Sequence, residues 1–410
     1  MVKSGNFLPY GRQFISDEDI EAVVKVLRSD FLTQGPAVEE FEKDFAEAVG
    51  SKFCVAVSNG TAALHLSAME AGLSKGDAAI VPGITFCATS NAVLYTGATP
   101  IFADVNPTSG LIEVESIKRC IQIAKSQGLN LKAILPVHYS GMPVDLRAIE
   151  DLAEENGLKL IQDACHALGA EISDLSTGSW KPVASTSEGT ACWSFHPVKH
   201  ITTGEGGAIT TNSPDQAKKL AQLRSHGITK KPDDFLQKDK AFDKTASAVK
   251  PWYHEMQILG YNYRLCDIQA ALGRSQLSRL KSNIQNRRRI AAFYDEALQS
   301  IDGLNLPQFE SSDRRSALHL YVVNIDFAKF KMSRTSVMQS LAKDGIGTQV
   351  HYIPVPFHPF YQNNGHLWLS DDLRSCQTFY ESELSLPMFP ELNVSDLNRV
   401  VDSLKKLFKA

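Results

Sequence analysis

The sequence predicts an α/β protein in which a mostly parallel sheet is flanked by helices and a smaller C-terminal α+β domain follows. Two observations support this prediction. Short apolar runs alternate with stretches of helical length from residue 53 onward, and such alternation is typical of a parallel sheet covered by helices. The chain of 410 residues also exceeds one ordinary core, so we expect a large domain over 1–269 and a small domain over 270–410.

The first half begins with two helices and continues with strands. Ser16 precedes three acidic residues and a helical spacing of apolar residues, which predicts a capped helix. Residues 32–36 interrupt this helix, and a second one over 38–49 ends at Gly50. The apolar runs that follow predict strands at 53–57, 79–82, 100–104, 132–137 and 158–163.

The second half contains an irregular stretch before the pattern resumes. Residues 229–257 include many lysines and aspartates without a clear period, which predicts a surface insertion or mobile loop. A shorter insertion is expected at 173–187. Elsewhere we expect helices at 215–225, 266–300, 333–344, 371–383 and 393–408, and strands at 318–325 and 348–352.

Composition excludes several classes of function. Hydrophobic residues make up 43% and charged residues 21% of the chain, and the net charge is −4, so no electrostatic footprint for nucleic acid exists. No run approaches the roughly 18 apolar residues of a membrane span, and the start lacks a signal-peptide pattern. We therefore expect a cytoplasmic protein without membrane or nucleic-acid partners. The seven scattered cysteines are read as free thiols, with Cys165 and Cys192 as apolar fillers, and no metal site is expected.

One lysine and one aspartate indicate the chemistry. Lys199 lies between a short apolar strand and a glycine-rich hairpin, and a lysine amine becomes nucleophilic where burial disfavours its ammonium form. A solvated loop lysine is the ordinary alternative. Asp163 ends an apolar strand, where ligands collect in parallel sheets. Because pyridoxal 5'-phosphate (PLP) needs a lysine for its aldehyde and a carboxylate for its ring nitrogen, this pair predicts a PLP enzyme.

A helix start after the first strand offers a place for the phosphate of PLP. Gly60, Thr61 and Ala62 open this helix, and helix N-termini bind phosphate through free N–H groups and the helix dipole. An ordinary capped helix start is the alternative. The sequence contains neither a P-loop nor a dinucleotide-binding glycine motif, so ATP and NAD readings lose their main support.

Segments spread over nearly the whole chain resemble the DegT/DnrJ/StrS family of PLP-dependent nucleotide-sugar aminotransferases, which have fold type I and aminate keto-sugars linked to nucleoside diphosphates. Sugar 3-dehydratases resemble these enzymes but carry histidine at the position of Lys199, so the lysine here, followed by His200, favours transamination. The matching segments are 32–36, 58–64, 85–86, 136–138, 163–169, 194–207, 259–264, 319–321, 350–354 and 385–387.

The resemblance implies further contacts with the cofactor. Phe86 is expected to stack on the ring, and His166 to donate a hydrogen bond to the ring oxygen or to Asp163. Ser194 is expected to join Thr61 at the phosphate. The structural alternative is that Phe86 and His166 are ordinary core residues.

The resemblance also implies a homodimer with shared active sites. Asn262 matches a family asparagine that reaches the phosphate of PLP in the neighbouring subunit, although an asparagine in a turn is common. The residues expected near the sugar nucleotide are Tyr10, Thr33, Asn262, His319, Leu320 and Tyr321.

The substrate follows from the branch that the chain resembles. That branch aminates C4 of a UDP-linked 4-keto-6-deoxy-N-acetylhexosamine on the way to pseudaminic acid, and L-glutamate is the amino donor that the family suggests. Asp30 stands where this branch begins its substrate loop with a basic residue. Amination of a GDP-perosamine precursor or of a 4-amino-4-deoxyarabinose precursor is the alternative activity. A non-catalytic sugar-nucleotide-binding homologue is a further alternative, which the presence of Lys199 and Asp163 disfavours.

Overall fold

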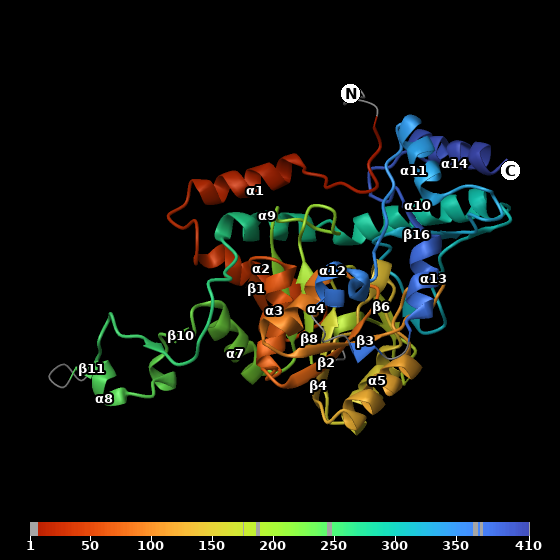
Figure 1. The fold of residues 1–410 in the computed structure, drawn as a ribbon. Helices are drawn as coiled ribbons and strands as arrows, with labels where there is room; N and C mark the ends of the chain where they lie inside the picture. The colour runs from red at the N-terminus through yellow and green to blue at the C-terminus, as the bar shows by residue number, and fades with distance from the viewer. Residues whose placement is uncertain are drawn as a thin grey trace.

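The computed structural model describes residues 7–174, 176–185, 189–243, 248–363, 368–369 and 372–409. Its centre is an eight-stranded sheet with the strand order β1-β9-β8-β5-β4-β2-β3-β17 (Figure 1). Strand β9 runs antiparallel to β1 and β8, whereas the remaining neighbours pair in parallel. The predicted fold class, a mostly parallel sheet flanked by helices, is confirmed.

The strands of this sheet are short and buried. The five strands predicted in the first half all belong to it, with ends that differ from the prediction by up to three residues. Their bounds, with those of the other members, are β1 (Phe53–Val57), β2 (Asp77–Pro82), β3 (Thr99–Ala103), β4 (Asn130–Ile134), β5 (Lys159–Asp163), β8 (Thr190–Ser194), β9 (Gly207–Thr211) and β17 (Trp368–Leu369).

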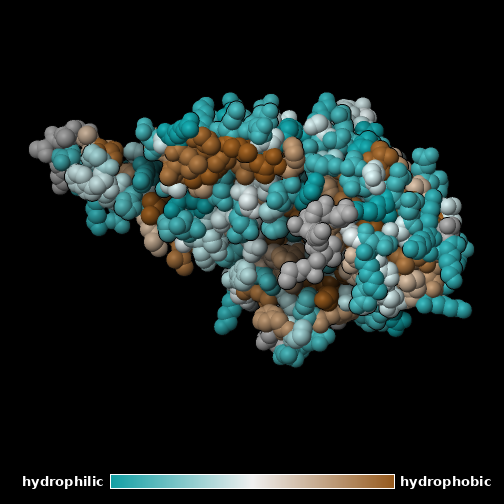
Figure 2. All heavy atoms as spheres, turned by 90° about the horizontal axis from the view of Figure 1, so that it is seen from above, coloured by the Kyte–Doolittle hydropathy of each residue, from teal (hydrophilic) through white to brown (hydrophobic). Residues whose placement is uncertain are grey.

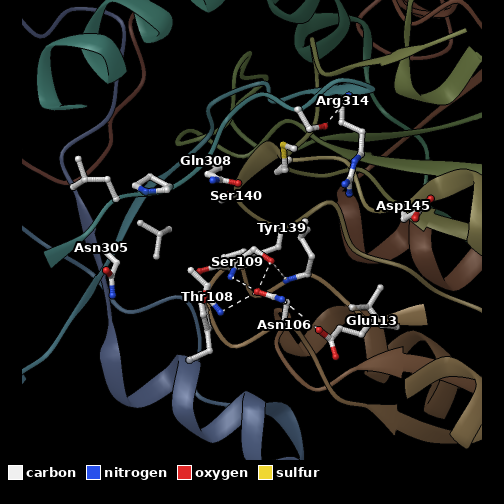
Figure 3. Close-up of a pocket in the computed structure, with 18 of the residues that line it drawn as sticks. Asn106, Thr108, Ser109, Glu113, Tyr139, Ser140, Asp145, Asn305, Gln308 and Arg314 are labelled. Carbon is white, nitrogen blue, oxygen red and sulfur yellow. Dashed lines mark hydrogen bonds between the residues drawn. The ribbon is translucent and has the colours of Figure 1, made fainter. Parts of the chain in front are cut away.

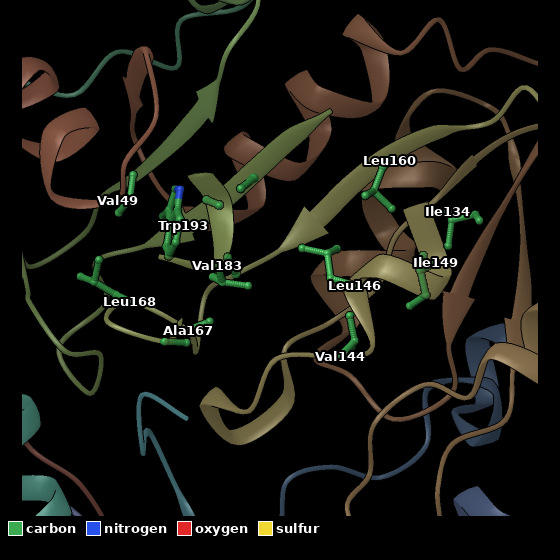
Figure 4. Close-up of a cluster of buried hydrophobic side chains, with 14 of the residues drawn as sticks. Val49, Ile134, Val144, Leu146, Ile149, Leu160, Ala167, Leu168, Val183 and Trp193 are labelled. Carbon is green, nitrogen blue, oxygen red and sulfur yellow. The ribbon is translucent and has the colours of Figure 1, made fainter. Parts of the chain in front are cut away.

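Helices cover both faces of the sheet, because alternate residues of each strand pack on opposite sides. In β2, Ile80 belongs to one buried cluster and Val81 to the other. Figure 4 shows part of the first cluster, where Ile134, Ile149 and Trp193 are buried side chains. The helices of the first face are α2 (Pro36–Ala48), α5 (Val114–Ser126) and α6 (Leu146–Glu155), and those of the second are α3 (Gly60–Glu70), α4 (Cys87–Tyr95) and α7 (Pro214–Arg224).

The C-terminal part forms a third buried cluster around a small antiparallel sheet of order β14-β16-β18. Leu8, from the N-terminal part of the chain, also packs in this cluster, and β17, from the C-terminal part, joins the large sheet. Each part thus contributes a segment to the other. The predicted domain boundary at 269/270 stays a prediction. The elements here are β14 (Leu304–Asn305), β16 (Tyr321–Ile325), β18 (Glu383–Leu386), α10 (Leu280–Leu298), α11 (Arg334–Lys343), α12 (Pro359–Asn363), α13 (Arg374–Ser382) and α14 (Val394–Phe408).

Two predicted elements are wrong. The single helix over 266–300 is two helices, α9 (Asp267–Leu277) and α10, separated where Arg279 leaves helical geometry. The strand expected at 348–352 is absent from this described segment, in which Gln349 forms one isolated bridge with Ser385. The helix expected at 371–383 runs from Arg374, and residue 371 itself lies outside the described residues.

The two predicted insertions contain local structure. The longer one forms an arm that extends from the body in Figure 1, in agreement with the predicted surface insertion. Its elements are β10 (Ile228–Thr229) paired with β13 (Glu255–Met256), β11 (Phe242–Asp243) paired with β12 (Ala248–Val249), and helix α8 (Lys238–Ala241). Within the shorter one, β6 (Glu171–Ser173) pairs with β7 (Trp180–Pro182) and with β15 (Arg314–Arg315).

Helix α1 (Asp17–Leu27) packs on the body through a polar residue. Asp19 is fully buried and accepts hydrogen bonds from Ser275, Gln276 and Arg279 at 2.6 Å each. The apolar side of the helix therefore faces outward, and Figure 2 shows it as a continuous hydrophobic patch on the surface. The exposed apolar residues of α1 and its flanking segments are Phe14, Ile15, Ile20, Leu27, Phe31 and Leu32.

Two further expectations concern the thiols and the membrane. All seven cysteines are free, as predicted. Among the helices that the structure describes, none has the length and apolar character that crossing a bilayer requires.

Candidate active site

Asp163 occupies the carboxyl end of β5, between two parallel neighbours of the large sheet. Its side chain is 6% exposed. The Thr89 hydroxyl donates to Oδ2 at 2.7 Å, and the Cys165 amide donates to Oδ1 at 3.2 Å. The hydroxyls of Thr85 and Thr89 are themselves 2.7 Å apart. These donors hold the carboxylate in one orientation at the edge where ligands collect in parallel sheets.

Lys199 lies in the turn between the antiparallel strands β8 and β9. The turn is fixed by backbone bonds, including the Lys199 amide to the His196 carbonyl at 2.8 Å and the Phe195 amide to the Gly206 carbonyl at 2.8 Å. Desolvation lowers the pKa of the Lys199 amine below its usual value, although the charges of Cys165 and Asp163 act in the opposite direction. The amine is thus easier to deprotonate than a surface lysine, as nucleophilic use requires.

Gly60 forms a cradle with Ser194 and Cys165 at the start of α3. A Cβ atom at Gly60 would lie 3.0 Å from the Cβ of Ser194 and 3.3 Å from the sulfur of Cys165, so a side chain there would fill the space. Helix α3 presents its first-turn amides at this point. The Asn59 side chain already accepts from the amide of Ala62 at 2.8 Å. This bond leaves the amides of Gly60 and Thr61 for an anion, and the contact predicted for Ala62 stays a prediction.

Three buried histidines line the inner wall of the site. The His319 ring lies 4.3 Å from the His166 ring and 5.4 Å from the His200 ring. His200 contacts the carbonyl oxygen of Ala317 through Nε2 at 2.9 Å. Burial lowers the pKa of all three, and the nearby Lys199 amine contributes to each shift. The histidines are consequently neutral at neutral pH, with one donor and one acceptor nitrogen each.

Aromatic side chains surround the mouth of the site. Phe86 precedes α4 and is 60% exposed, with its ring 5.9 Å from that of Tyr352. The hydroxyl of Tyr352 lies 3.3 Å from Nε2 of His166, and the ring of Tyr10 lies 5.3 Å from that of His351. Phe86 is not a core residue, so its ring remains available to a planar ligand.

The sequence predicts contacts with the cofactor or the substrate for four further residues, Thr33, Asn262, Leu320 and Tyr321. Thr33 and Asn262 are exposed, and within the described residues neither side chain joins the contacts around Asp163 and His166. Leu320 is 3% exposed and Tyr321 is fully buried, with the Tyr321 hydroxyl donating to Asp295 at 2.6 Å. Leu320 packs in the second buried cluster and Tyr321, the first residue of β16, in the third, and the contact with the sugar nucleotide predicted for both stays a prediction.

Sequence reasoning did not assign roles to Thr89 and Tyr352. Thr85 precedes α4 and Thr89 lies in its first turn, and their hydroxyls are 2.7 Å apart. Their separation of four residues in the sequence was the available signal for the contact of Thr89 with Asp163. Tyr352 belongs to a segment that resembles the family, yet its contact with His166 joins residues 186 positions apart in the sequence, which no local pattern reveals.

The arrangement fits PLP and offers little to a metal ion. Nδ1 of His166 is buried without a hydrogen-bond partner, a state that a bound polar ligand would relieve. The cradle at Gly60 is open to an anionic group, and Phe86 presents an exposed ring. Over the ranges that the structure describes, no group of three or more potential ligands is placed to hold a metal ion.

A groove of about 990 Å³ lies outside this cluster (Figure 3). It runs between the turn around Asn106 and Ser109 and the segment that carries Asn305 and Gln308, and Tyr139 forms part of its wall. Neither Lys199 nor Asp163 lines it. The groove therefore does not define the catalytic centre.

Comparison with known proteins gives one consistent family. Residues 13–405 match the DegT/DnrJ/EryC1/StrS aminotransferase family. The spore coat polysaccharide biosynthesis protein SpsC of Bacillus subtilis is 36% identical over 408 residues, which span 99% of this chain and 98% of SpsC. PseC of Helicobacter pylori, an aminotransferase in pseudaminic acid biosynthesis, superposes with a TM-score of 0.85 at 30% identity over 98% of this chain and 99% of PseC. DesV of S. venezuelae superposes with a TM-score of 0.81 at 29% identity, over 96% and 95% of the two chains.

Proposed function

Because this chain belongs to the DegT/DnrJ/EryC1/StrS aminotransferase family, we propose that it transfers an amino group from L-glutamate to the 4-keto carbon of a UDP-linked 4-keto-6-deoxy-N-acetylhexosamine. The coarser activity, PLP-dependent amination of a sugar for polysaccharide synthesis, follows from the family and its members. The observation that carries the proposal is the pairing of Lys199 with Asp163 at one edge of the sheet. The pathway of PseC supports the choice of sugar.

The residues assigned to PLP follow from the contacts of the site. Lys199 would hold the aldehyde carbon, and Asp163 would keep the ring nitrogen protonated. Phe86 would cover one face of the ring. The amides of Gly60 and Thr61 and the hydroxyl of Ser194 would receive the phosphate. His166 would satisfy its unpartnered Nδ1 at the ring oxygen.

The proton transfer is assigned to Lys199. When bound, PLP supplies an electron sink for the carbon from which a proton is removed. Once the incoming amino acid has displaced it from the aldehyde, the Lys199 amine, with its lowered pKa, would accept a proton at Nζ from the amino-acid carbon and pass it to the cofactor carbon, and it would move a proton from the cofactor carbon to the sugar carbon in the second half of the exchange. Asp163 is held by Thr89 and by the Cys165 amide and would not itself move. The overall exchange converts an amino acid and a keto-sugar into an oxo acid and an amino sugar.

The working unit in this proposal is a homodimer with shared active sites. The outward apolar face of α1 has no cover in one chain, with Ile20 and Leu27 each 53% exposed. A self-complementary patch of this kind suits a twofold interface. Asn262 is exposed beside the arm and would reach the PLP phosphate of the second copy, and Thr33, in the connection that follows α1, would approach its sugar nucleotide. Tyr10 and His319 would act within their own site.

A direct assay tests the substrate. Purified protein is incubated with PLP, L-glutamate and the UDP-linked 4-keto-6-deoxy-N-acetylhexosamine, and mass spectrometry follows the amino sugar and the oxo acid. We expect turnover with the UDP-sugar and none with Lys199→Ala. Turnover with a GDP-linked 4-keto-6-deoxyhexose instead would contradict the substrate and leave the aminotransferase intact. Absence of PLP binding in the wild-type protein would contradict both.

A further inference from the structure

The segments 350–354 and 385–387 resemble the family, yet the function proposed above gives neither a role. The structure brings them together. Gln349 and Ser385 exchange backbone hydrogen bonds at 2.9 and 3.2 Å, which fixes the loop against β18. His351 lies two residues after Gln349 in this loop and contacts two side chains of β18, Glu383 and Ser385.

His351 is held at three points. Its amide donates to Oε1 of Glu383 at 2.8 Å, and its ring Nδ1 lies 2.8 Å from the hydroxyl of Ser385. Its carbonyl accepts a hydrogen bond from the hydroxyl of Tyr139. The side chains of His351, Glu383, Ser385 and Tyr139 are all at most 6% exposed. We call these four residues the His351 clamp.

The residue after His351 enters the active site. The hydroxyl of Tyr352 lies 3.3 Å from Nε2 of His166, and its ring lies 5.9 Å from that of Phe86. A hydrogen bond at Nε2 restricts the ring orientation and the tautomer of a neutral histidine. The nitrogen left for a ligand is Nδ1, which is buried and without a partner.

The composition of the clamp argues for positioning rather than stability alone. Glu383 is fully buried, and its Oε2 has no hydrogen-bond partner. Burial raises the pKa of Glu383 to about 8, although the charge of Arg334 and the His351 amide act in the opposite direction. A buried carboxyl with an unused oxygen destabilises a fold compared with an apolar side chain. Its contribution here is the hydrogen bond that it accepts from His351.

We propose that the His351 clamp is a positioning device: Glu383, Ser385 and Tyr139 fix His351, and the adjoining Tyr352 thereby orients His166 toward bound PLP. This inference rests on the proposed function, since it assumes that PLP occupies the site. The residues of the clamp act through Tyr352 and His166 and do not themselves touch the reacting atoms.

Single hydroxyl deletions test the clamp. Tyr352→Phe removes the contact with His166, and Tyr139→Phe removes the contact with the His351 carbonyl. Tyr294→Phe is the matched control, because the buried Tyr294 hydroxyl also donates to a backbone carbonyl, that of Pro387 at 3.1 Å, but contacts no clamp residue. The readouts are the dissociation constant of PLP, from the quenching of intrinsic fluorescence, and the pH midpoint of the absorption change of bound PLP.

We expect Tyr352→Phe and Tyr139→Phe to weaken PLP binding about two- to tenfold, which is the effect of one net hydrogen bond, and to shift the pH midpoint. Tyr294→Phe should change neither. Should Tyr139→Phe not fold, Ser385→Ala replaces it, because that change removes only the contact with the His351 ring. Wild-type values for Tyr352→Phe, or equal effects of Tyr294→Phe and the clamp variants, would overturn the inference. Failure of the wild-type protein to bind PLP would instead overturn the proposed function.

Discussion

At the scale of single residues, burial shifts the pKa of the amine and imidazole groups in the site, and hydrogen bonds orient its carboxylate. The Lys199 amine is made easier to deprotonate by desolvation, and the Asp163 side chain accepts hydrogen bonds from the Thr89 hydroxyl and the Cys165 amide. His166, His200 and His319 carry no charge at neutral pH, because burial lowers the pKa of each. The amine of lowered pKa therefore lies close to neutral histidines.

Replacing the carboxylate tests its role at the ring nitrogen. Asp163→Asn keeps the size and an acceptor for Thr89 but cannot hold the nitrogen protonated. We expect kcat to fall by about three powers of ten, equivalent to about 4 kcal/mol of transition-state stabilisation, while PLP remains bound. Steady-state kinetics with Asp145→Asn, an exposed helix cap on α6, serve as the control. Near wild-type turnover of Asp163→Asn with PLP bound would disprove the assignment.

The buried acid of the clamp gives a pH dependence of stability. The pKa of Glu383 is raised from 4.5 to about 8 in the folded chain by burial, with Arg334 and His351 opposing, and the Tyr139 and Tyr352 hydroxyls also face it. Between these two pH values the folded protein retains the Glu383 proton that the unfolded chain has released. The contribution of protonated Glu383 to the free energy of unfolding is therefore complete below pH 4.5 and is lost as the pH rises through 8.

The glutamine of Glu383→Gln cannot ionise, so the loss of stability at high pH should be absent from this variant. We expect the Tm of Glu383→Gln minus the Tm of the wild type to increase as the pH rises from about 5 to about 9, the range over which Glu383 loses its proton. Thermal unfolding followed by circular dichroism measures this difference, and Glu310→Gln, at an exposed carboxylate, is the control. Parallel Tm curves for the two proteins would show that Glu383 is ionised in the fold.

At the scale of elements, the sequence predicts those features that depend on local pattern. The buried strands β1 to β5 follow from apolar runs between helices, and the turn that carries Lys199 follows from glycines after an apolar strand. The break between α9 and α10 does not follow from a local pattern. It lies at Arg279, whose side chain contacts Asp19, 260 positions away in the sequence. The apolar period of α1 predicts a helix, and the contacts of Asp19 with Ser275, Gln276 and Arg279 show which side of it packs on the body.

The outward face of α1 predicts an effect on assembly. Ile20→Lys combined with Leu27→Lys places four charges in a twofold interface, since each change occurs in both copies. We expect the dimer dissociation constant to rise by about two powers of ten or more, because charges facing one another across an interface cost several kcal/mol. Light scattering over a concentration series measures this rise. Glu21→Gln, at an exposed position of the same helix, should leave it unchanged, and an unaltered dimer of the double variant would exclude this interface.

At the scale of the whole molecule, two features of the fold support a shared site. The chain presents an apolar face on α1 and an extended arm, and Leu236 and Trp252 on that arm are 76% and 73% exposed. Asn262 lies where this arm returns to the body. The residues of these surfaces are far apart in the sequence and come together only in the folded chain. Composition therefore does not indicate a dimer, which the family resemblance implies.

Complementation tests the shared site. Mixed dimers of a Lys199→Ala chain and an Asn262→Ala chain contain one site with both defects and one site with neither. We expect activity to return to at most about half of the wild-type value per dimer, provided that Asn262→Ala alone is severely impaired. Each variant alone is the control. Inactive hybrids whose formation is verified by mass spectrometry would contradict the assignment of Asn262 to the second copy.

The central claim is that Lys199 is the residue that holds PLP. The most direct measurement is reduction of the PLP-loaded protein with borohydride, which fixes the cofactor covalently to the lysine that bears it, followed by proteolysis and mass spectrometry of the peptides. We predict a single modified residue, Lys199, and no modification in Lys199→Ala. A label on any other lysine of the wild-type protein, or an equal yield of label from Lys199→Ala, would contradict the account.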